Sequence, residues 1–228
     1  MNQKIKSIVK RNKVLHTFAQ ILLAVKAKLA LPIRGRGNRI INKGVFLQVR
    51  IDIDGNNNIV DIAKGAFLTN MTIYIRGSNN LLRIGAYCKF KGGCVWFEDN
   101  NGQVIIGDHT SIESAHLAVT EPGKRITIGE DCMLSAGIDI RTGDSHSILD
   151  TATGKRINYA QDVTIGNHVW IGLNAVLLKG ASIGNNSIIS TKAVVTQPIP
   201  DHSIAAGVPA KVIKSNVDWL RERTYETE

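Results

Sequence analysis

The chain has 228 residues, of which 43% are hydrophobic and 21% are charged, a composition typical of soluble globular proteins. The formal net charge is +9, but residues 1–50 contain twelve Lys or Arg and no acidic residue, whereas in residues 51–228 the acidic side chains slightly outnumber the basic ones. This excludes a basic surface over the whole protein of the kind that binds nucleic acid. The three cysteines have no metal or redox spacing, and their odd number argues against a disulfide framework and favours a reducing, cytoplasmic compartment.

Residues 1–36 are predicted to form a basic amphipathic helix or arm that ends near Pro32. The segment does not match a signal peptide, because Lys26 and Lys28 interrupt its apolar stretch, and it is too short and too charged to span a bilayer. Two roles stay open. Its apolar face packs on the body or a neighbouring subunit, or it contacts the inner face of a membrane while the lysines and Arg11 meet anionic lipid.

The next part of the chain is a regular repeat, marked by evenly spaced isoleucines. Each repeat has an isoleucine, a small side chain four residues later in most repeats, and a large apolar side chain six residues later. The isoleucines are Ile40, Ile62, Ile84, Ile106 and Ile128. Stretches such as "GNNN" at 55–58 and "GSNN" at 77–80 supply turn residues between the coils. Such columns predict a solenoid of stacked coils. Cys88, Cys94 and Cys132 are interpreted as core residues.

The pattern breaks at "RTGDSHSILDTATGKRINYAQD", residues 141–162, and then resumes with a shorter period of six. The apolar positions of the second part are Ile165, Ile171, Leu177, Ile183, Ile189 and Val195. Three six-residue rungs per turn predict a triangular prism of short parallel strands. Residues 141–162 are expected to leave the prism as a long loop, and long loops in compact proteins are usually functional or disordered.

Residues 214–228 read as a short C-terminal helix, capped near Ser215 or Asn216, with Trp219 and Leu220 docked on the prism.

The segment "VTIGNHVWIGLNAVLLKGASIGNNSIISTKAVVTQPIPDHSIAAGVPAKVIK", residues 163–214, resembles the hexapeptide-repeat acyltransferases. It is most similar to the branch with galactoside, maltose and xenobiotic acetyltransferases and capsular-polysaccharide O-acetyltransferases. The resemblance implies a mainly β fold with a left-handed parallel β-helix over residues 37–213. It also implies a homotrimer, with acetyl-coenzyme A (acetyl-CoA) in the groove between two prisms, so that each active site draws on two subunits.

The resemblance also implies that the inserted loop carries the catalytic histidine. Here that residue is His146, whose spacing from Trp170 of the "VWIG" rung is similar to the spacing in relatives. An imidazole suits the removal of a proton from an attacking hydroxyl at physiological pH. Asp144 is the candidate that orients His146, although an aspartate beside a glycine is as often a turn former. Trp170 is expected to form a wall for the pantetheine arm or the acceptor sugar.

Coenzyme A adds phosphates, which need cations and amides. The C-terminal pattern of the family, matched onto this sequence, places four residues near the coenzyme: Thr191, Thr196, Lys211 and Lys214. Gly172 and Lys192 are further candidates. The competing interpretation of each lysine is a solvated surface charge.

The leading hypothesis is therefore acetyl-CoA-dependent O-acetylation of a sugar hydroxyl, in a surface polysaccharide or its precursor, without a metal. N-acetylation of an amino sugar on the same fold stays open. A zinc enzyme of the carbonic-anhydrase type would need three imidazoles at one metal, for which His109, His116 and His146 are the candidates. An inactive trimeric scaffold that binds polysaccharide is the third class.

Overall fold

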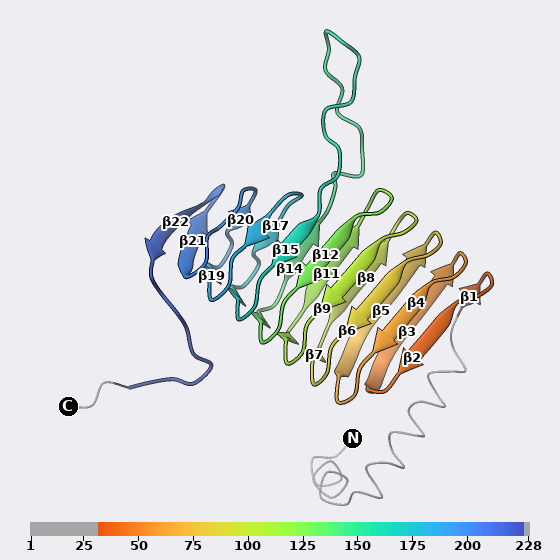
Figure 1. Ribbon diagram of the computed structural model, residues 1–228, viewed down its shortest axis with the longest axis horizontal. Coiled ribbons are helices and arrows are strands. Elements are labelled where there is room, and N and C mark those ends of the chain that lie inside the picture. Colours follow the sequence, from red (N-terminus) through yellow and green to blue (C-terminus); the bar gives the residue numbers. More distant parts are fainter. Residues whose placement is uncertain (1–31, 226–228) are drawn as a thin grey trace, which may run out of the picture.

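The computed structural model describes residues 32–225, and every regular element in this range is a β-strand. The strands form parallel ladders in which each coil of the chain stacks on the one before it, so the molecule is a β-solenoid (Figure 1). The predicted mainly β parallel solenoid is confirmed. The predicted N-terminal helix lies outside the described residues. No helix in residues 32–225 is long and apolar enough to cross a membrane.

The prism has three faces, and the first is a sheet of seven parallel strands. These strands are β2 (Arg39–Asn42), β4 (Ile59–Ile62), β6 (Leu81–Ile84), β9 (Gln103–Ile106), β12 (Arg125–Ile128), β15 (Val163–Ile165) and β18 (Ser182–Ile183). Ile62, Ile84 and the matching isoleucines of later coils point inward and are fully buried. Burying one such side chain contributes about 1.5–3 kcal/mol. Ile40 is an exception, because it pairs with Val60 and not with Ile62.

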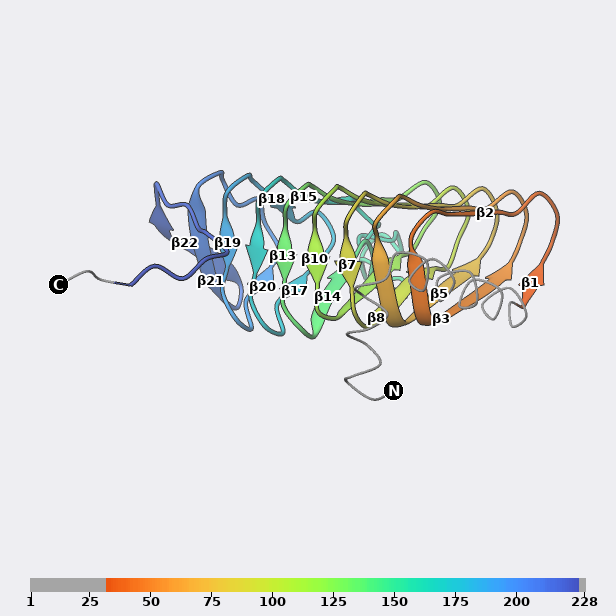
Figure 2. The same ribbon diagram turned by 90° about the horizontal axis from the view of Figure 1, so that it is seen from below.

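The second face is built mainly from two-residue strands, several of which lie side by side in Figure 2. They are β7 (Lys89–Phe90), β10 (Ser111–Ile112), β13 (Met133–Leu134), β16 (Trp170–Ile171), β19 (Ile188–Ile189) and β21 (Ser203–Gly207). The last strand, β22 (Ala210–Ser215), pairs antiparallel with β21 and closes the C-terminal end.

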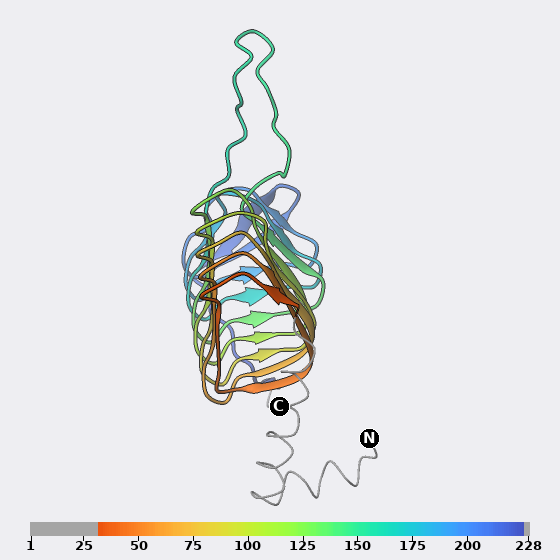
Figure 3. The same ribbon diagram turned by 90° about the vertical axis from the view of Figure 1, so that its right-hand side faces the viewer.

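The third face contains β8 (Gly93–Phe97), β11 (Ala115–Val119), β14 (Ile138–Arg141), β17 (Val176–Leu177) and β20 (Val194–Val195). Two long strands, β3 (Val45–Asp54) and β5 (Phe67–Arg76), cover both the second and third faces, with a bend where Gln48 and Asn70 adopt positive φ. The short strand β1 (Ile33–Arg34) pairs with the end of β3. Seen along the solenoid, the three faces enclose one continuous core (Figure 3).

The register confirms a longer period before the loop and a shorter one after it. Val60 pairs with Leu82, and Ile62 with Ile84, so successive coils are offset by 22 residues, as are the hydrogen-bonded Asn58 and Asn80. After the loop Ile165 pairs with Ile183, an offset of 18 residues, which Asn167 and Asn185 share.

Asparagines connect successive coils at the corner between the third and first faces. Asn58 and Asn80 are buried there, and the Oδ1 atom of Asn58 accepts from the amide of Asn80 at 2.9 Å. Gly55 is required at this corner, because a Cβ atom would lie 1.8 Å from the carbonyl oxygen of Gly77.

Two of the three cysteines belong to the core, as predicted, but the third does not. Cys88 and Cys132 are buried, whereas Cys94 points outward from β8, because Val95 and Phe97 of the same strand point inward. The interpretation of Cys94 as a core residue is therefore wrong. Its outward neighbours across the sheet are Thr72 and His116.

Burial raises the pKa of the Cys88 and Cys132 thiols to about 11 each. Because the thiolate is the reactive form, we expect both thiols to resist alkylation at pH 7–8 in the folded protein. Cys94, whose pKa burial also raises, is nevertheless half-exposed and should react first. Mass spectrometry after timed treatment with iodoacetamide tests this. Labelling of Cys88 before Cys94 would contradict the described packing.

The predicted C-terminal helix is wrong over the described residues. Residues 210–215 form β22, and residues 216–225 run without helical structure across the second face. The segment is held by its side chains: the indole N–H of Trp219 donates to the carbonyl oxygen of His168 at 2.8 Å, and Arg221 binds the carbonyl oxygens of Asp131 and Cys132. These contacts outweigh local helix propensity. Trp219 is buried, as expected, but Leu220 is 68% exposed and does not dock.

Candidate active site

The segment between β14 and β15 is an ordered hairpin that projects from the corner between the third and first faces (Figures 1 and 3). Its two arms pair through a bridge between Leu149 and Arg156 and through the amide of Ile157, which donates to the carbonyl oxygen of Ile148 at 2.9 Å. At the tip, the carboxylate of Asp150 accepts from the amide of Thr153 at 2.7 Å. The long loop expected from the break in the repeat is thus present and has its own hydrogen-bonded structure.

His146 lies on the first arm of this hairpin with its side chain exposed. The preceding residue, Ser145, has a φ of 63°, and the amide of His146 donates to the carbonyl oxygen of Asp144 at 2.8 Å. These two features make a tight bend at which the side chain of His146 is exposed. An exposed imidazole on a fixed backbone can accept a proton from a bound substrate.

Asn158, on the second arm, fixes the backbone of this bend. Its Nδ2 atom donates to the carbonyl oxygen of His146 and to Oδ2 of Asp144, both at 2.8 Å, and its Oδ1 atom accepts from the amide of Ile148 at 2.7 Å. The side chain is buried although it belongs to a projecting loop. Sequence analysis missed Asn158, because an asparagine in a polar loop has no spacing or partner that marks it.

Asp144 is anchored to the prism. Its carboxylate forms an ion pair with Lys179, which follows β17, and accepts from Asn158. The hydrogen bond from Lys179 lowers the pKa of Asp144, and burial opposes this only in part. No hydrogen bond of the His146 ring occurs within residues 32–225. Asp144 therefore acts on the backbone of His146 through Asn158, and its predicted role as a partner of the imidazole stays a prediction.

A pocket of about 470 Å³ lies at the root of the hairpin. Asp144 and Lys179 line it together with Thr196, which sequence analysis placed near the coenzyme. The structure thus brings one candidate coenzyme residue into the same pocket as one candidate catalytic residue.

Trp170 lies on β16 of the second face, and 39% of its surface is exposed. Its ring is tilted against Trp219 of the C-terminal segment, with 6.1 Å between the ring centroids. The hairpin with His146 leaves from the corner that joins the other two faces. The two residues of the proposed site therefore project from different sides of one prism.

The remaining candidates lie in the C-terminal coils. Gly172 is buried and has a packing role, since a Cβ atom would lie 2.6 Å from the amide nitrogen of Thr191 in the next coil. Thr191 and Lys192 are exposed at a corner, where Lys192 has a φ of 60°. Lys211 and Lys214 are exposed on β22. Both side chains are accessible to a phosphate of the coenzyme.

A cluster that sequence analysis did not find surrounds His168, which lies at the corner just before Trp170 and strand β16. The Nδ1 atom of its ring lies 2.8 Å from Oδ2 of Asp131, and the Nε2 atom lies 2.9 Å from the carbonyl oxygen of Trp219. Both partners accept hydrogen bonds only, so the two hydrogen bonds form together only when both ring nitrogens carry a proton, as in the imidazolium form. The ring also stacks on the indole of Trp219 with 4.2 Å between centroids.

This arrangement gives the attachment of the C-terminal segment a pH dependence. Burial alone would lower the pKa of His168, but the hydrogen bonds from its ring to Trp219 and Asp131 and the nearby carboxylates raise it overall. A raised pKa means that the stabilisation is complete below about pH 6.5, the usual value for histidine, and is lost as the pH rises through the higher folded value. The fluorescence of Trp219 is obtained by subtracting the spectrum of the variant Trp219→Phe. We expect it to report release of the C-terminal segment as the pH rises over that range. The variant His168→Gln should abolish the transition, and a transition that persists in it would contradict this assignment.

Residues 162–197 match the family described as "Bacterial transferase hexapeptide (six repeats)". Polysialic acid O-acetyltransferase of Neisseria meningitidis is 34% identical over 196 residues, which cover 76% of this chain and 90% of that protein. The enzyme of the same name from Escherichia coli O1:K1 / APEC is 38% identical over 140 residues, covering 61% of this chain and 45% of that longer protein.

Solved structures give the same result. The polySia-specific acetyltransferase NeuO superposes with a TM-score of 0.78 and 34% identity, covering 86% of this chain and 91% of that one. The polysialic acid O-acetyltransferase OatWY superposes with a TM-score of 0.80 and 31% identity, covering 85% and 92%.

A parallel solenoid with six-residue rungs and a projecting histidine loop is consistent with an acyltransferase scaffold. Together with relatives that match over nearly their whole length, it shows that the chain belongs to the hexapeptide-repeat acyltransferase family. The predictions of the family and of an O-acetyltransferase activity are confirmed.

The zinc alternative finds no support in the described residues. His109 stacks on Tyr87 at the corner between the first and second faces, whereas His116 lies beside Asp139 on the third face, 3.4 Å from its carboxylate. Within residues 32–225 no three His, Cys, Asp or Glu side chains are grouped so that they could hold a metal ion.

Proposed function

We propose that the protein transfers an acetyl group from acetyl-CoA to a sugar hydroxyl of a surface polysaccharide or its precursor, and that the polysaccharide is acidic. The observation that carries the proposal is the anchored hairpin with exposed His146, in a chain whose full-length relatives are named polysialic acid O-acetyltransferases. The acidic acceptor is inferred from these relatives, whose names give polysialic acid as the polymer on which they act.

In this proposal His146 is the general base. The imidazole accepts the proton of the acceptor hydroxyl while the hydroxyl oxygen attacks the thioester carbonyl carbon. The carbon–sulfur bond then breaks, and the protonated imidazole returns the proton to the leaving thiolate. One acetyl ester and one coenzyme thiol are formed for each thioester consumed. Asp144, Asn158 and Lys179 hold the bend that presents the imidazole.

The donor is assigned to the C-terminal coils. Lys211 and Lys214 are exposed cations there, suited to the coenzyme phosphates, and Thr191, Lys192 and Thr196 lie in the preceding coils. Trp170 forms an aromatic wall on the second face, beside which the pantetheine arm or the sugar would lie.

We further propose a homotrimer of left-handed prisms in which the hairpin of one subunit reaches the second face of the next. The hairpin presents four large apolar side chains that are more than half exposed in the single chain: Ile148, Leu149, Ile157 and Tyr159. Exposed apolar side chains gathered on one projecting element indicate a protein contact. The contact would also bring His146 to Trp170, which one prism keeps apart.

Purified protein should release free thiol from acetyl-CoA only when an acceptor is present. Polysialic acid and other capsular polysaccharides would be compared with neutral sugars, and the product would be treated with hydroxylamine at alkaline pH, which cleaves O-acetyl esters and leaves N-acetyl amides. The proposal is supported if an acidic polysaccharide causes thiol release and hydroxylamine removes the acetyl group from the product. A product that resists hydroxylamine would establish the N-acetyltransferase alternative, and the absence of turnover with any acceptor would leave the scaffold alternative.

A cytoplasmic location with peripheral membrane contact is part of the same proposal and rests on the basic sequence of residues 1–36. A version that lacks residues 1–31 should lose co-sedimentation with vesicles that contain anionic lipid, while the full chain sediments and is released by salt. If the full chain and the shortened version sediment equally, residues 1–31 do not mediate membrane contact, and packing of this segment on the trimer is favoured.

A further inference from the structure

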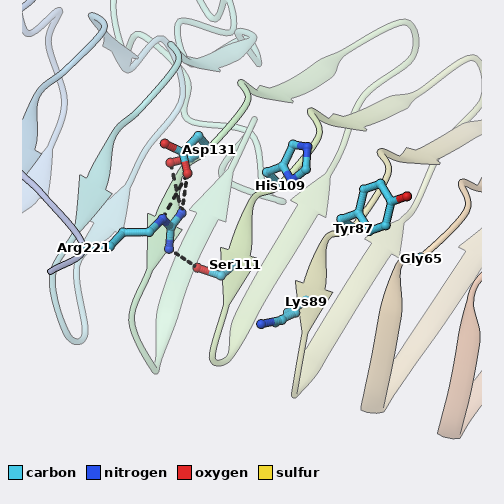
Figure 4. Close-up of a pocket in the computed structure, with 7 residues that line it drawn as sticks. All are labelled: Gly65, Tyr87, Lys89, His109, Ser111, Asp131 and Arg221. Carbon is cyan, nitrogen blue, oxygen red and sulfur yellow. Dashed lines mark hydrogen bonds and ion pairs between the residues drawn. The ribbon is translucent and has the colours of Figure 1, made fainter.

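A second pocket, of about 530 Å³, lies along the second face on the N-terminal side of Trp170 (Figure 4). We call it the Tyr87 groove. Its walls are two parallel rows. Tyr87, His109 and Asp131 stand at the corners of successive coils, and Lys89 and Ser111 stand on the adjoining strands. Arg221, from the C-terminal segment, closes one end.

The corner row is a stack of flat groups. The Tyr87 ring lies directly against Gly65, where a Cβ atom would be 2.5 Å from a ring carbon, and its other side faces His109 at a centroid distance of 5.4 Å. Because neighbours partly cover both sides of the ring, Tyr87 presents mainly its edge and its hydroxyl group to the groove, with 55% of the residue exposed. The row therefore offers polar edges at the regular spacing of the coils.

The groove has a positive local charge. Lys89 is exposed and makes no ion pair within residues 32–225. Asp131 is the one carboxylate in the lining, and its charge is met by both Arg221, at 2.9 Å, and His168, at 2.8 Å. Arg221 uses four of its five N–H groups on Asp131, Ser111 and Cys132, which leaves one on Nη1. The available groups are thus an ammonium, one guanidinium N–H, the hydroxyl groups of Tyr87 and Ser111, and the imidazole of His109.

The position of the groove relates it to the proposed site. Lys89, Ser111, Met133 and Trp170 form one parallel ladder, so Lys89 stands three rungs from Trp170. At the usual strand spacing this is roughly 14 Å. One sugar ring at Trp170 does not reach Lys89, but a polymer that runs along the second face does.

We propose that the Tyr87 groove binds a carboxylated sugar unit of an acidic polysaccharide, at a distance along the chain from the unit that is acetylated. The ammonium of Lys89 and the free N–H of Arg221 meet the carboxylate, and Tyr87, His109 and Ser111 meet hydroxyl groups. The inference rests on the proposed function for the identity of the ligand, and it specifies the acceptor as a polymer and not as a single sugar.

The test uses the full-length protein and oligomers of sialic acid of graded length. Lys89→Gln should raise KM about two- to fivefold for long oligomers, with unchanged kcat and an unchanged KM for the shortest acceptor, because one exposed charge contact is lost. Lys89→Glu should have the larger effect. Arg83→Gln is the matched control, since it removes one cation from the same coil on the first face and should leave KM unchanged.

Calorimetric binding of the same oligomers, without acetyl-CoA, separates this inference from the proposed function. If no acceptor is acetylated but long oligomers bind more weakly to Lys89→Gln than to the parent, the groove stands and the transferase proposal fails. The groove is overturned if acetylation occurs with a KM that is independent of acceptor length. Equal effects of Lys89→Gln and Arg83→Gln, or a rise in KM for acetyl-CoA alone, would overturn it as well.

Discussion

Replacing His146 with alanine is expected to lower kcat for acetyl transfer by about 10²- to 10⁴-fold, the usual contribution of a general base. The imidazole is exposed on the hairpin and makes no hydrogen bond within residues 32–225, so its loss removes no contact of the fold. The melting temperature should therefore be unchanged. Free-thiol release at saturating acetyl-CoA and acceptor measures the effect, and thermal unfolding followed by circular dichroism measures the stability.

His116→Ala is the matched comparison. His116 is half-exposed on the third face and pairs with Asp139, which in turn binds Arg141 at the start of the hairpin. Its removal should change kcat little. If His146→Ala retains activity while His116→Ala loses it, the base lies on the third face and the assignment made from the resemblance is wrong.

The second large effect is expected for Asn158→Ala, which should lower kcat by about 10²-fold, the loss that a displacement of about 1 Å causes in a catalytic group. The side chain bonds the carbonyl oxygen of His146, the carboxylate of Asp144 and the amide of Ile148, and alanine makes none of these bonds. Asn158 is buried and acts through His146, so it is a positioning residue. The KM for acetyl-CoA should remain unchanged.

A structural readout distinguishes positioning from a general loss of stability. In Asn158→Ala the hairpin should be cleaved faster by trypsin, for example after Lys155 or Arg156, while the prism melts at the parental temperature, because the hairpin lies outside the core. Thr153→Ala, at the hairpin tip, is the matched control and should retain kcat. If Asn158→Ala lowers the melting temperature and leaves kcat intact, the residue serves the fold and not the site.

The prism could be predicted because its information is local and repeated. Each coil places an inward isoleucine at the same offset, so the pairing of Ile62 with Ile84 and of Ile165 with Ile183 follows the spacing that the sequence contains. The loop could be predicted for the same reason, since a strict repeat makes an insertion visible. The assignment of His146 needed more than the repeat, because only the resemblance marks that residue within the loop.

Most of the missed features depend on contacts between distant parts of the chain. The bend at His146 is held by Asn158 on the opposite arm of the hairpin and, through Asp144, by Lys179 of the prism. The C-terminal segment has a helical composition but is held extended, since His168 and Asp131 bind it. Cys94 follows the hexad spacing, yet the strand alternation of β8 turns it outward. The periodicity of the sequence predicts most of the residues that face the core, but it does not predict which polar side chains outside the core form hydrogen bonds and ion pairs with one another.

The constant coil has a consequence for how such a protein can change in length. Removal of one whole coil, such as residues 56–77, would join equivalent positions and leave the later ladders in register, because Gly55 and Gly77 occupy the same corner. A deletion one residue shorter would turn inward side chains outward along the strand it entered. Length can therefore vary in whole steps of about 4.8 Å without disturbing the coils that carry His146 and Trp170. The number of N-terminal coils would then set the length of acceptor polymer that the enzyme holds at once.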